Sequence, residues 1–139
     1  MKVYIGNRNI QDENFKCITD LDILKYIADD SECTAIVIDG CLKNLKLSEL
    51  QSGLETAIKK LRINGDLVIN DIDFDLLLYA YAKNSDLVEL NTMVENIGGF
   101  KSLLTYQFIL EILKLYPNIS LSTIDLNNIE FRLSYKKLS

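Results

Sequence analysis

An acidic residue followed by a glycine, Asp39-Gly40, ends an apolar run at residues 34–38. The carboxyl ends of parallel strands are where open α/β sheets hold their ligands. An aspartate in this place can accept a hydrogen bond from an amine or hydroxyl, or take its proton as a general base. It can equally serve as a cap or turn residue, since glycine follows it. We predict Asp39 as the catalytic candidate, with the cap or turn as the alternative.

Other kinds of catalytic and metal site are excluded by residue type. The chain has no histidine, and its three cysteines show no paired metal spacing. A Ser-His-Asp triad, a Cys-His dyad and an imidazole metal site are therefore absent. Asp71, Asp73 and Asp75 form an acidic group after another apolar run. Carboxylates can bind a metal, but acidic residues are also favoured where a helix begins. We adopt the helix start and predict no metal.

Length and charge set the broad class. The chain has 139 residues, a net charge of −5 and 48% hydrophobic residues, which predicts one folded domain over residues 1–139. Its acidity argues against nucleic acid, which needs positive charge against phosphates. Neither a signal segment nor an apolar run long enough for a membrane span is evident, so we expect a cytoplasmic protein. A bias towards Asn, Ile, Lys and Leu hints at an AT-rich genome, such as that of a virus or a parasitic microbe.

Elements that can position these residues alternate along the chain. Short β-branched and apolar runs predict strands, and apolar residues at helical spacing predict helices. Expected strands cover residues 2–5, 15–18, 34–38, 66–69, 119–126 and 129–135; expected helices cover 21–28, 48–61, 71–82, 86–97 and 103–116. Asn64-Gly65 and Gly98-Gly99 are expected breaks, and Asn127-Asn128 is a hairpin turn. This order predicts an α/β fold with a doubly wound, Rossmann-like, mostly parallel sheet, helices on both faces and a C-terminal antiparallel hairpin.

The same order resembles the class I S-adenosylmethionine-dependent methyltransferases, most closely small members that begin at the first strand. Met1-Lys-Val-Tyr-Ile-Gly6 stands where these proteins open with a strand and a glycine-rich turn. Cys17-Ile-Thr-Asp20 stands at their second strand end, and Ile36-Val-Ile-Asp-Gly40 at their fourth strand. Lys59-Lys-Leu-Arg-Ile-Asn-Gly65 and Asp66-Leu-Val-Ile-Asn-Asp-Ile-Asp73 match the segment that follows.

The resemblance implies S-adenosylmethionine as cofactor. The implied cofactor-binding residues are Gly6, Asn7, Asp20, Asp39 and Gly40. Asp20 stands where a carboxylate accepts from both ribose hydroxyls, and a helix N-cap is its alternative. Asp39 would face the group that is methylated. Arg8 can pair with a carboxylate or remain a solvated loop charge.

The chain also departs from the family pattern. Only Gly6 remains of the glycines that let the backbone approach the cofactor. The segment between Asp20 and Thr34 has room for one helix, whereas the family places a helix, a third strand and an adenine-recognition loop there. We therefore favour a methyltransferase-like domain with a degenerate cofactor site that serves binding or assembly, with a protein partner or as a homo-oligomer. Several aromatic side chains can supply a docking face, with core or edge packing as the alternative: Tyr79, Tyr81, Tyr106, Phe108 and Tyr116. The alternative is a minimal active methyltransferase acting on a small molecule, sugar or protein group.

Overall fold

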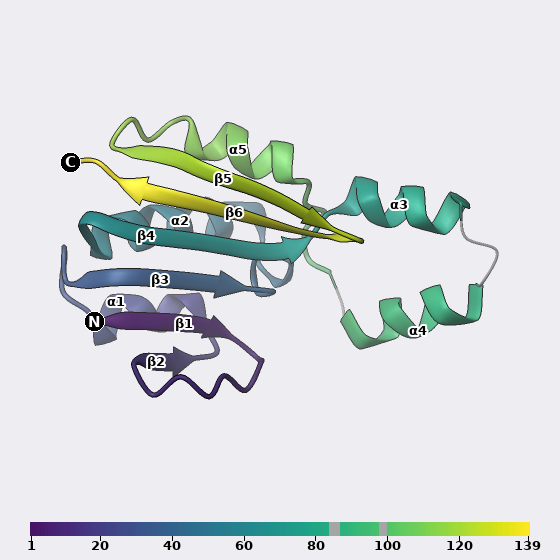
Figure 1. The fold of residues 1–139 in the computed structure, drawn as a ribbon, viewed down its shortest axis with the longest axis horizontal. Helices are drawn as coiled ribbons and strands as arrows, with labels where there is room; N and C mark the ends of the chain where they lie inside the picture. Colours follow the sequence, from purple (N-terminus) through teal and green to yellow (C-terminus); the bar gives the residue numbers. More distant parts are fainter. Residues whose placement is uncertain (84–86, 98–99) are drawn as a thin grey trace.

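A single six-stranded sheet organises the protein (Figure 1). The computed structural model describes residues 1–83, 87–97 and 100–139. The expected break at Gly98-Gly99 lies outside these residues. The strands are β1 (Lys2–Gly6), β2 (Phe15–Ile18), β3 (Cys33–Asp39), β4 (Leu61–Ile72), β5 (Ile119–Asn127) and β6 (Glu130–Lys137).

The strand order is β2-β1-β3-β4-β6-β5, with the first four strands parallel and β6 antiparallel to both its neighbours. This confirms the expected α/β fold with a mostly parallel, Rossmann-like sheet and a C-terminal antiparallel hairpin. Asn128 adopts φ 59° in the hairpin turn, a conformation that asparagine tolerates better than most residues. The strand order reverses between β1 and β3, so the carboxyl ends of these two strands meet at the switch point, where ligands bind in such sheets.

The main core lies between one face of the sheet and the helices behind it. These helices are α1 (Leu24–Ile27), preceded by the 3₁₀ turn η1 (Leu21–Ile23), α2 (Leu47–Lys60) and α5 (Tyr106–Leu113); a second 3₁₀ turn, η2 (Leu42–Asn44), follows β3. Val3, Ile36, Leu67 and Tyr135 lie side by side across the sheet and belong to this core. The helices contribute Leu24, Leu50, Leu54, Ile109 and Leu113.

The opposite face of the sheet carries no helix among the described residues. Figure 1 shows α1, α2 and α5 all behind the strands, which differs from the expected helices on both faces. The row Tyr4, Val37, Val68 and Ser134 runs across this open face, and its last three members are partly exposed. The reason lies between β1 and β2, where residues 7–14 contain no helix. A crossover that includes a helix needs at least about 10–12 residues, so this connection is too short to cover the face.

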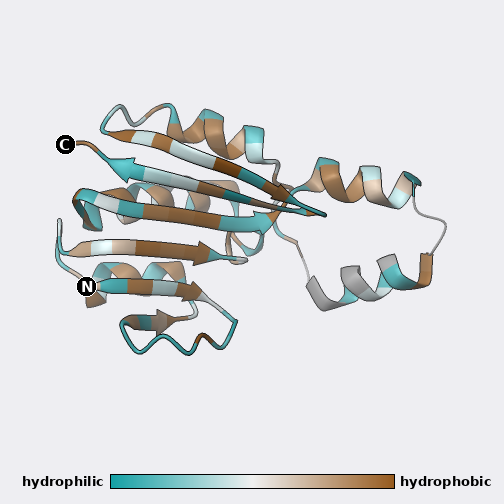
Figure 2. Cartoon of the chain, in the orientation of Figure 1, coloured by the Kyte–Doolittle hydropathy of each residue, from teal (hydrophilic) through white to brown (hydrophobic). Residues whose placement is uncertain are grey.

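Two helices form an arm beyond the carboxyl ends of the strands. They are α3 (Phe74–Lys83) and α4 (Leu87–Ile97), and Figure 1 shows both projecting away from the sheet. Tyr79 and Val88 are 64% and 78% exposed, and Leu78, Tyr81 and Leu87 are also exposed. Figure 2 shows hydrophobic colour along α3 and at the start of α4. The arm therefore presents apolar side chains that no other described part of the chain covers.

One local boundary differs from the pattern. Asn64-Gly65 does not end the segment before a strand; it lies inside β4, where Asn64 has φ 67° and the pairing with β3 shifts register between Cys33 and Ala35. Such a bulge lets β4 begin at Leu61.

No helix in the described part of the chain has both the length and the apolar character needed to cross a membrane.

Candidate functional site

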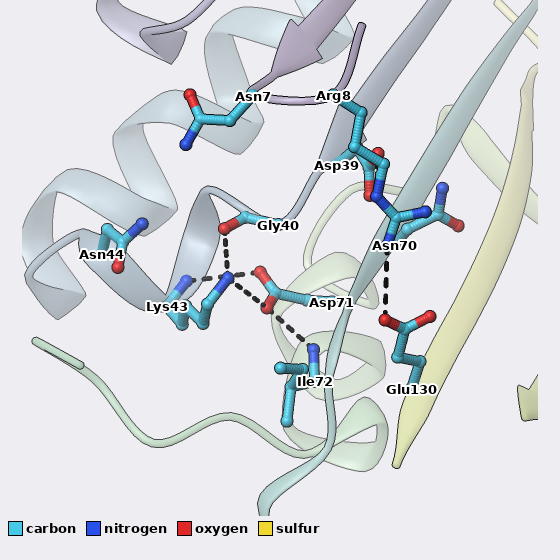
Figure 3. Close-up of a pocket in the computed structure, with 10 residues that line it drawn as sticks. All are labelled: Asn7, Arg8, Asp39, Gly40, Lys43, Asn44, Asn70, Asp71, Ile72 and Glu130. Atoms are coloured by element: carbon cyan, nitrogen blue, oxygen red, sulfur yellow. Dashed lines mark hydrogen bonds and ion pairs between the residues drawn. The ribbon is translucent and has the colours of Figure 1, made fainter. Parts of the chain in front are cut away.

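A polar pocket of about 330 Å³ lies at the carboxyl ends of β1, β3 and β4 (Figure 3). Its lining comes from Asn7 and Arg8 after β1, Asp39 and Gly40 at the end of β3, Lys43 and Asn44 in η2, Asn70, Asp71 and Ile72 at the end of β4, and Glu130 on β6. Three predicted residues, Asn7, Asp39 and Gly40, thus line one pocket. It occupies the switch point of the sheet, as the strand order requires.

Asp39 is held by two internal partners. Its exposed fraction is 8%, and its Oδ2 atom accepts a 2.6 Å hydrogen bond from the Tyr4 hydroxyl. The same oxygen lies 3.5 Å from Arg8 Nε. Burial, followed by the hydrogen bond and negative charge of Asp39, raises the pKa of Tyr4 to about 12. Tyr4 therefore stays protonated and remains a donor to Asp39 across the ordinary pH range.

Arg8 bridges two carboxylates above the sheet. Besides Asp39, it donates to Glu130 through a side-chain contact of 3.3 Å between Nη2 and Oε1. Figure 3 shows its side chain extending between the ends of β3 and β6. Of the two alternatives for Arg8, a paired charge is what the structure shows, and its partners are internal. Because Arg8 is 66% exposed, solvent screens these contacts and they add little to stability.

Gly6 is packed against protein atoms. A Cβ placed on it would lie 2.6 Å from the backbone oxygen of Asp39 and 2.8 Å from the Tyr4 hydroxyl oxygen. Gly6 does not line the pocket. The glycine at the end of β1 therefore lets the Asp39 backbone of β3 and the ring of Tyr4, two residues earlier on β1, lie close to Gly6.

A buried ion pair, Lys43 with Asp71, forms the floor of the pocket, and sequence reasoning did not single out Lys43. The Nζ–Oδ1 distance is 3.5 Å, and the two side chains are 9% and 0% exposed. Lys43 also donates to the Gly40 carbonyl oxygen. Asp71 Oδ2 accepts from the backbone N–H groups of Leu42 and Lys43 at 3.1 and 3.3 Å. A lysine inside the run Cys41-Leu42-Lys43-Asn44-Leu45 was the available signal.

These contacts fix η2 against the end of β4. Burial raises the pKa of Asp71, while the Lys43 charge and the backbone donors oppose that rise. Asp73, two residues further on, accepts from Leu76 N at 2.9 Å and from Tyr106 N at 2.8 Å, and so joins the first turn of α3 to that of α5. This supports the helix-start interpretation for the acidic group. No group of three metal-binding side chains occurs among the described residues.

A second pocket of about 380 Å³ adjoins the first and contains Asp20. Asn7 and Asn44 line both pockets, and Cys41 and Glu49 also line the second. Asp20 is the N-cap of η1, and its Oδ1 atom accepts from Asp22 N at 3.0 Å. The N-cap alternative for Asp20 is therefore realised. The structure brings Asn7, Asp20, Asp39 and Gly40 around two neighbouring pockets, with Gly6 packed beneath.

One buried acceptor at the site has no hydrogen-bond partner among the described residues. The Oδ1 atom of Asn70 is buried and unpaired, and Asn70 lines the first pocket. Buried polar atoms are nearly always paired, with protein, water or ligand. Gly40, with φ 75°, donates its N–H to the Asn70 carbonyl at 2.8 Å, which fixes the loop beside that side chain.

Solved structures with a similar fold include methyltransferases. The PH0226 protein from Pyrococcus horikoshii matches with a TM-score of 0.63 and 14% identity over 88% of this chain. An S-adenosylmethionine-dependent methyltransferase from Methanosarcina mazei matches with a TM-score of 0.59 and 14% identity over 89% of the chain. The N-methyltransferase NodS from Bradyrhizobium japonicum, solved with S-adenosylhomocysteine, matches with a TM-score of 0.56 and 10% identity over 93%. The chain has a class I methyltransferase-like fold.

The likeness is one of structure alone. This chain spans 58%, 66% and 57% of the lengths of these three proteins. No protein-family model matches the sequence. No curated protein matches it either. A fold shared at such low identity does not carry an activity with it, because function depends on the site.

Proposed function

We propose that this protein is a non-catalytic, methyltransferase-like domain that serves binding or assembly. One observation carries the proposal: the residues that the family resemblance assigns to cofactor binding make contacts with other residues of this chain. Asp39 Oδ2 accepts from Tyr4 and faces Arg8, while Asp20 Oδ1 caps η1. The close approach that Gly6 permits is taken by the Asp39 backbone and the Tyr4 hydroxyl. These residues do not fit S-adenosylmethionine well.

The connections between strands support the same proposal. The cofactor's adenine would be recognised in the segment after β2, which here holds only η1, α1 and a short turn before β3. The β1–β2 connection has no helix, so no helix N-terminus follows Gly6 to attract a ligand carboxylate. Donors and acceptors for both ends of the cofactor are thus reduced.

The second candidate function, a minimal active methyltransferase, is favoured by the pockets themselves. They lie at the switch point, and together they bring Asn7, Asp20, Asp39 and Gly40 close to one another. The plantazolicin methyltransferase BamL, which matches with a TM-score of 0.61, was solved with S-adenosylhomocysteine. In such an enzyme Asp39 would hold the amine or hydroxyl to be methylated, and positioning would supply much of the rate.

Isothermal titration of the purified chain with S-adenosylmethionine and S-adenosylhomocysteine separates the two candidates. The non-catalytic proposal expects no heat and no thermal shift at a ligand concentration of ~1 mM. Binding at micromolar Kd would overturn it. Asp20→Ala and Gly6→Val provide the second readout, because an active enzyme would lose cofactor binding with either variant. A domain without cofactor would change only in stability.

A further inference from the structure

The open sheet face is one surface that no helix of the described residues covers. Its middle row is Tyr4, Val37 and Val68, with Ala35 beside it, and the charged Lys2, Asp66 and Arg132 lie above and below. Val37, Val68 and Ala35 remain partly exposed. Mostly parallel sheets are normally covered by helices on both faces. The fold therefore has a vacant helix layer over β1, β3, β4 and β6.

The arm is the second surface. Tyr79, Leu78 and Tyr81 on α3 and Leu87 and Val88 on α4 are exposed. A sheet face of this type is normally covered by helices, and the arm consists of two helices whose apolar side chains are exposed. The two surfaces are therefore complementary. In Figure 1 the arm lies end to end with the sheet, so it cannot fold onto its own open face as drawn.

We propose that two copies of this chain exchange arms, so that α3 and α4 of each copy cover the open sheet face of the other. A two-fold axis that runs across the strand ends, between sheet and arm, produces this arrangement. This rotation places the open face of the second copy against the arm of the first. It also places the arm of the second copy against the open face of the first. The contact is isologous and closed, as in most homodimers.

The dimensions of the two surfaces agree. Four strands spaced ~4.8 Å apart and about five residues long give a face of about 300 Å². Helices α3 and α4, of 10 and 11 residues, are each about 15 Å long. Two helices of this length, each with a diameter of ~10 Å, have a combined projected area of about 300 Å² as well.

The buried area favours a second copy over a foreign helical segment. One arm on one face buries about 600 Å² when both surfaces are counted, which is below the usual size of a stable interface. The reciprocal exchange makes this contact twice and reaches about 1,200 Å², the lower limit for stable complexes. Only a partner that also offers a matching face for the arm doubles the contact, and a second copy does so by symmetry.

Sedimentation velocity on the full chain, from ~5 to ~200 µM, tests the exchange. The expected result is a concentration-dependent dimer. Val68→Lys, on the open face, and Tyr79→Asp, on the arm, each raise the dimer Kd by at least ~30-fold, the effect of a central interface residue. Leu126→Lys is the matched control: Leu126 is 49% exposed on β5, outside both surfaces, and should leave the Kd unchanged. Circular dichroism and urea unfolding establish that each variant is folded.

Mixing the two interface variants tests reciprocity. A Val68→Lys chain keeps an intact arm and a Tyr79→Asp chain keeps an intact face, so an equimolar mixture has one unaltered contact and forms more dimer than either variant alone. A monomer at ~200 µM would overturn the proposal. So would variants that dimerise like the unaltered chain, or a mixture that behaves as the sum of its parts.

This inference deepens the proposed assembly function, and the two can fail separately. Absence of a dimer, with no binding of S-adenosylmethionine, removes arm exchange and leaves the non-catalytic domain. A dimer that binds the cofactor removes the non-catalytic proposal and leaves arm exchange standing.

Discussion

Tyr4 and Asp39 stand on neighbouring parallel strands, and the Tyr4 hydroxyl donates a 2.6 Å hydrogen bond to Asp39 Oδ2. The contact joins β1 to β3 at the switch point of the sheet. It couples the residue predicted as catalytic to a phenol whose pKa is about 12. The site is therefore organised around an internal donor.

Replacing Tyr4 with Phe should change how stability depends on alkaline pH. The pKa of Tyr4 rises from 10.0 to about 12 in the folded chain. Its contribution is therefore fully present below pH 10 and is lost as the pH rises through 12. Tyr4→Phe should be less stable at pH 7 by about 1 kcal/mol, because Asp39 loses a donor. It should then lose less further stability between pH 10 and 12 than the unaltered chain does.

Urea unfolding at several pH values measures this difference. Tyr135→Phe is a useful companion, because burial alone, without a carboxylate, raises the pKa of Tyr135 to about 12. Both variants should lose less unfolding free energy at alkaline pH than the unaltered chain does, but only Tyr4→Phe should remove the hydrogen bond to Asp39. An unchanged alkaline profile in Tyr4→Phe would contradict the role given to the hydrogen bond.

Gly6→Ala should destabilise the protein by about 2 kcal/mol, in the range for overpacked sites. The new methyl group would lie 2.6 Å from a backbone oxygen of β3, which cannot rotate away. Gly53→Ala in α2 is the control. Its methyl group would meet the end of the Leu21 side chain, which can change rotamer, and alanine favours the helix. If Gly6→Ala and Gly53→Ala lost equal stability in thermal unfolding, the close approach of backbone to Gly6 would not be what requires glycine there.

Asp71→Asn should cost more stability than Lys43→Met. The asparagine leaves the buried Lys43 charge unpaired and turns an N–H₂ group towards backbone donors, at a cost of about 3 kcal/mol. Lys43→Met leaves Asp71 charged, but its backbone donors at Leu42, Lys43 and Ile72 remain. We expect about 1–2 kcal/mol for that change. The double variant should lose less stability than the sum of the losses of the two single variants.

The pH gives a second readout of this pair. Burial already raises the pKa of Asp71, and removing the Lys43 charge raises it further. A group with a raised pKa favours the folded state while it is protonated and loses that contribution as the pH rises through its folded pKa. The deficit of Lys43→Met should therefore shrink when unfolding is measured at about pH 5 in place of pH 7. A deficit that grows on acidification would contradict the assignment.

Asp20→Ala should lower the free energy of unfolding by about 1 kcal/mol, the usual effect of losing an N-cap. The lost contact is the 3.0 Å hydrogen bond from Asp22 N. Asp22→Ala, which keeps that cap, should cost less in the same urea titration. If Asp20→Ala left stability unchanged, capping would not be the function of Asp20 and the cofactor role would regain support.

The elements of the fold follow from local sequence more closely than their packing does. The strand at residues 15–18 has the same bounds in the structure, and the Asn127-Asn128 turn forms the hairpin. β-branched and aromatic residues are enriched in strands, so such runs indicate a strand from local sequence. Helices α3 and α4 were also expected, but their departure from the sheet was not. Periodicity marks an apolar stripe without indicating which surface covers it.

The open face illustrates the same limit. Val37 and Val68 alternate with Ile36, Ile38, Leu67 and Ile69, so β3 and β4 read as strands buried on both faces. Only the eight-residue connection at residues 7–14 reveals that one face has no helix. Connection length, weighed against the length of a crossover, was the signal that the sequence offered.

The site was predicted in part. Asn7, Asp39 and Gly40 line one pocket because parallel strand ends converge, which is a property of the topology. Tyr4, Lys43 and Glu130 were not foreseen. Glu130 reaches the pocket from β6, 122 residues from its partner Arg8 in sequence, and no local pattern reports such a pairing.

The strand order also bears on synthesis at the ribosome. Strand β6 lies between β4 and β5, although β5 precedes it in the chain. Until residues 130–137 have emerged, β4 presents an unpaired backbone edge and β5 has no strand beside it. Until then the nascent chain carries an open template for strand addition, and such an exposed strand edge favours misassociation with other chains. Pulse-labelled ribosome-bound chains that end before and after β6 should accordingly differ sharply in protease resistance.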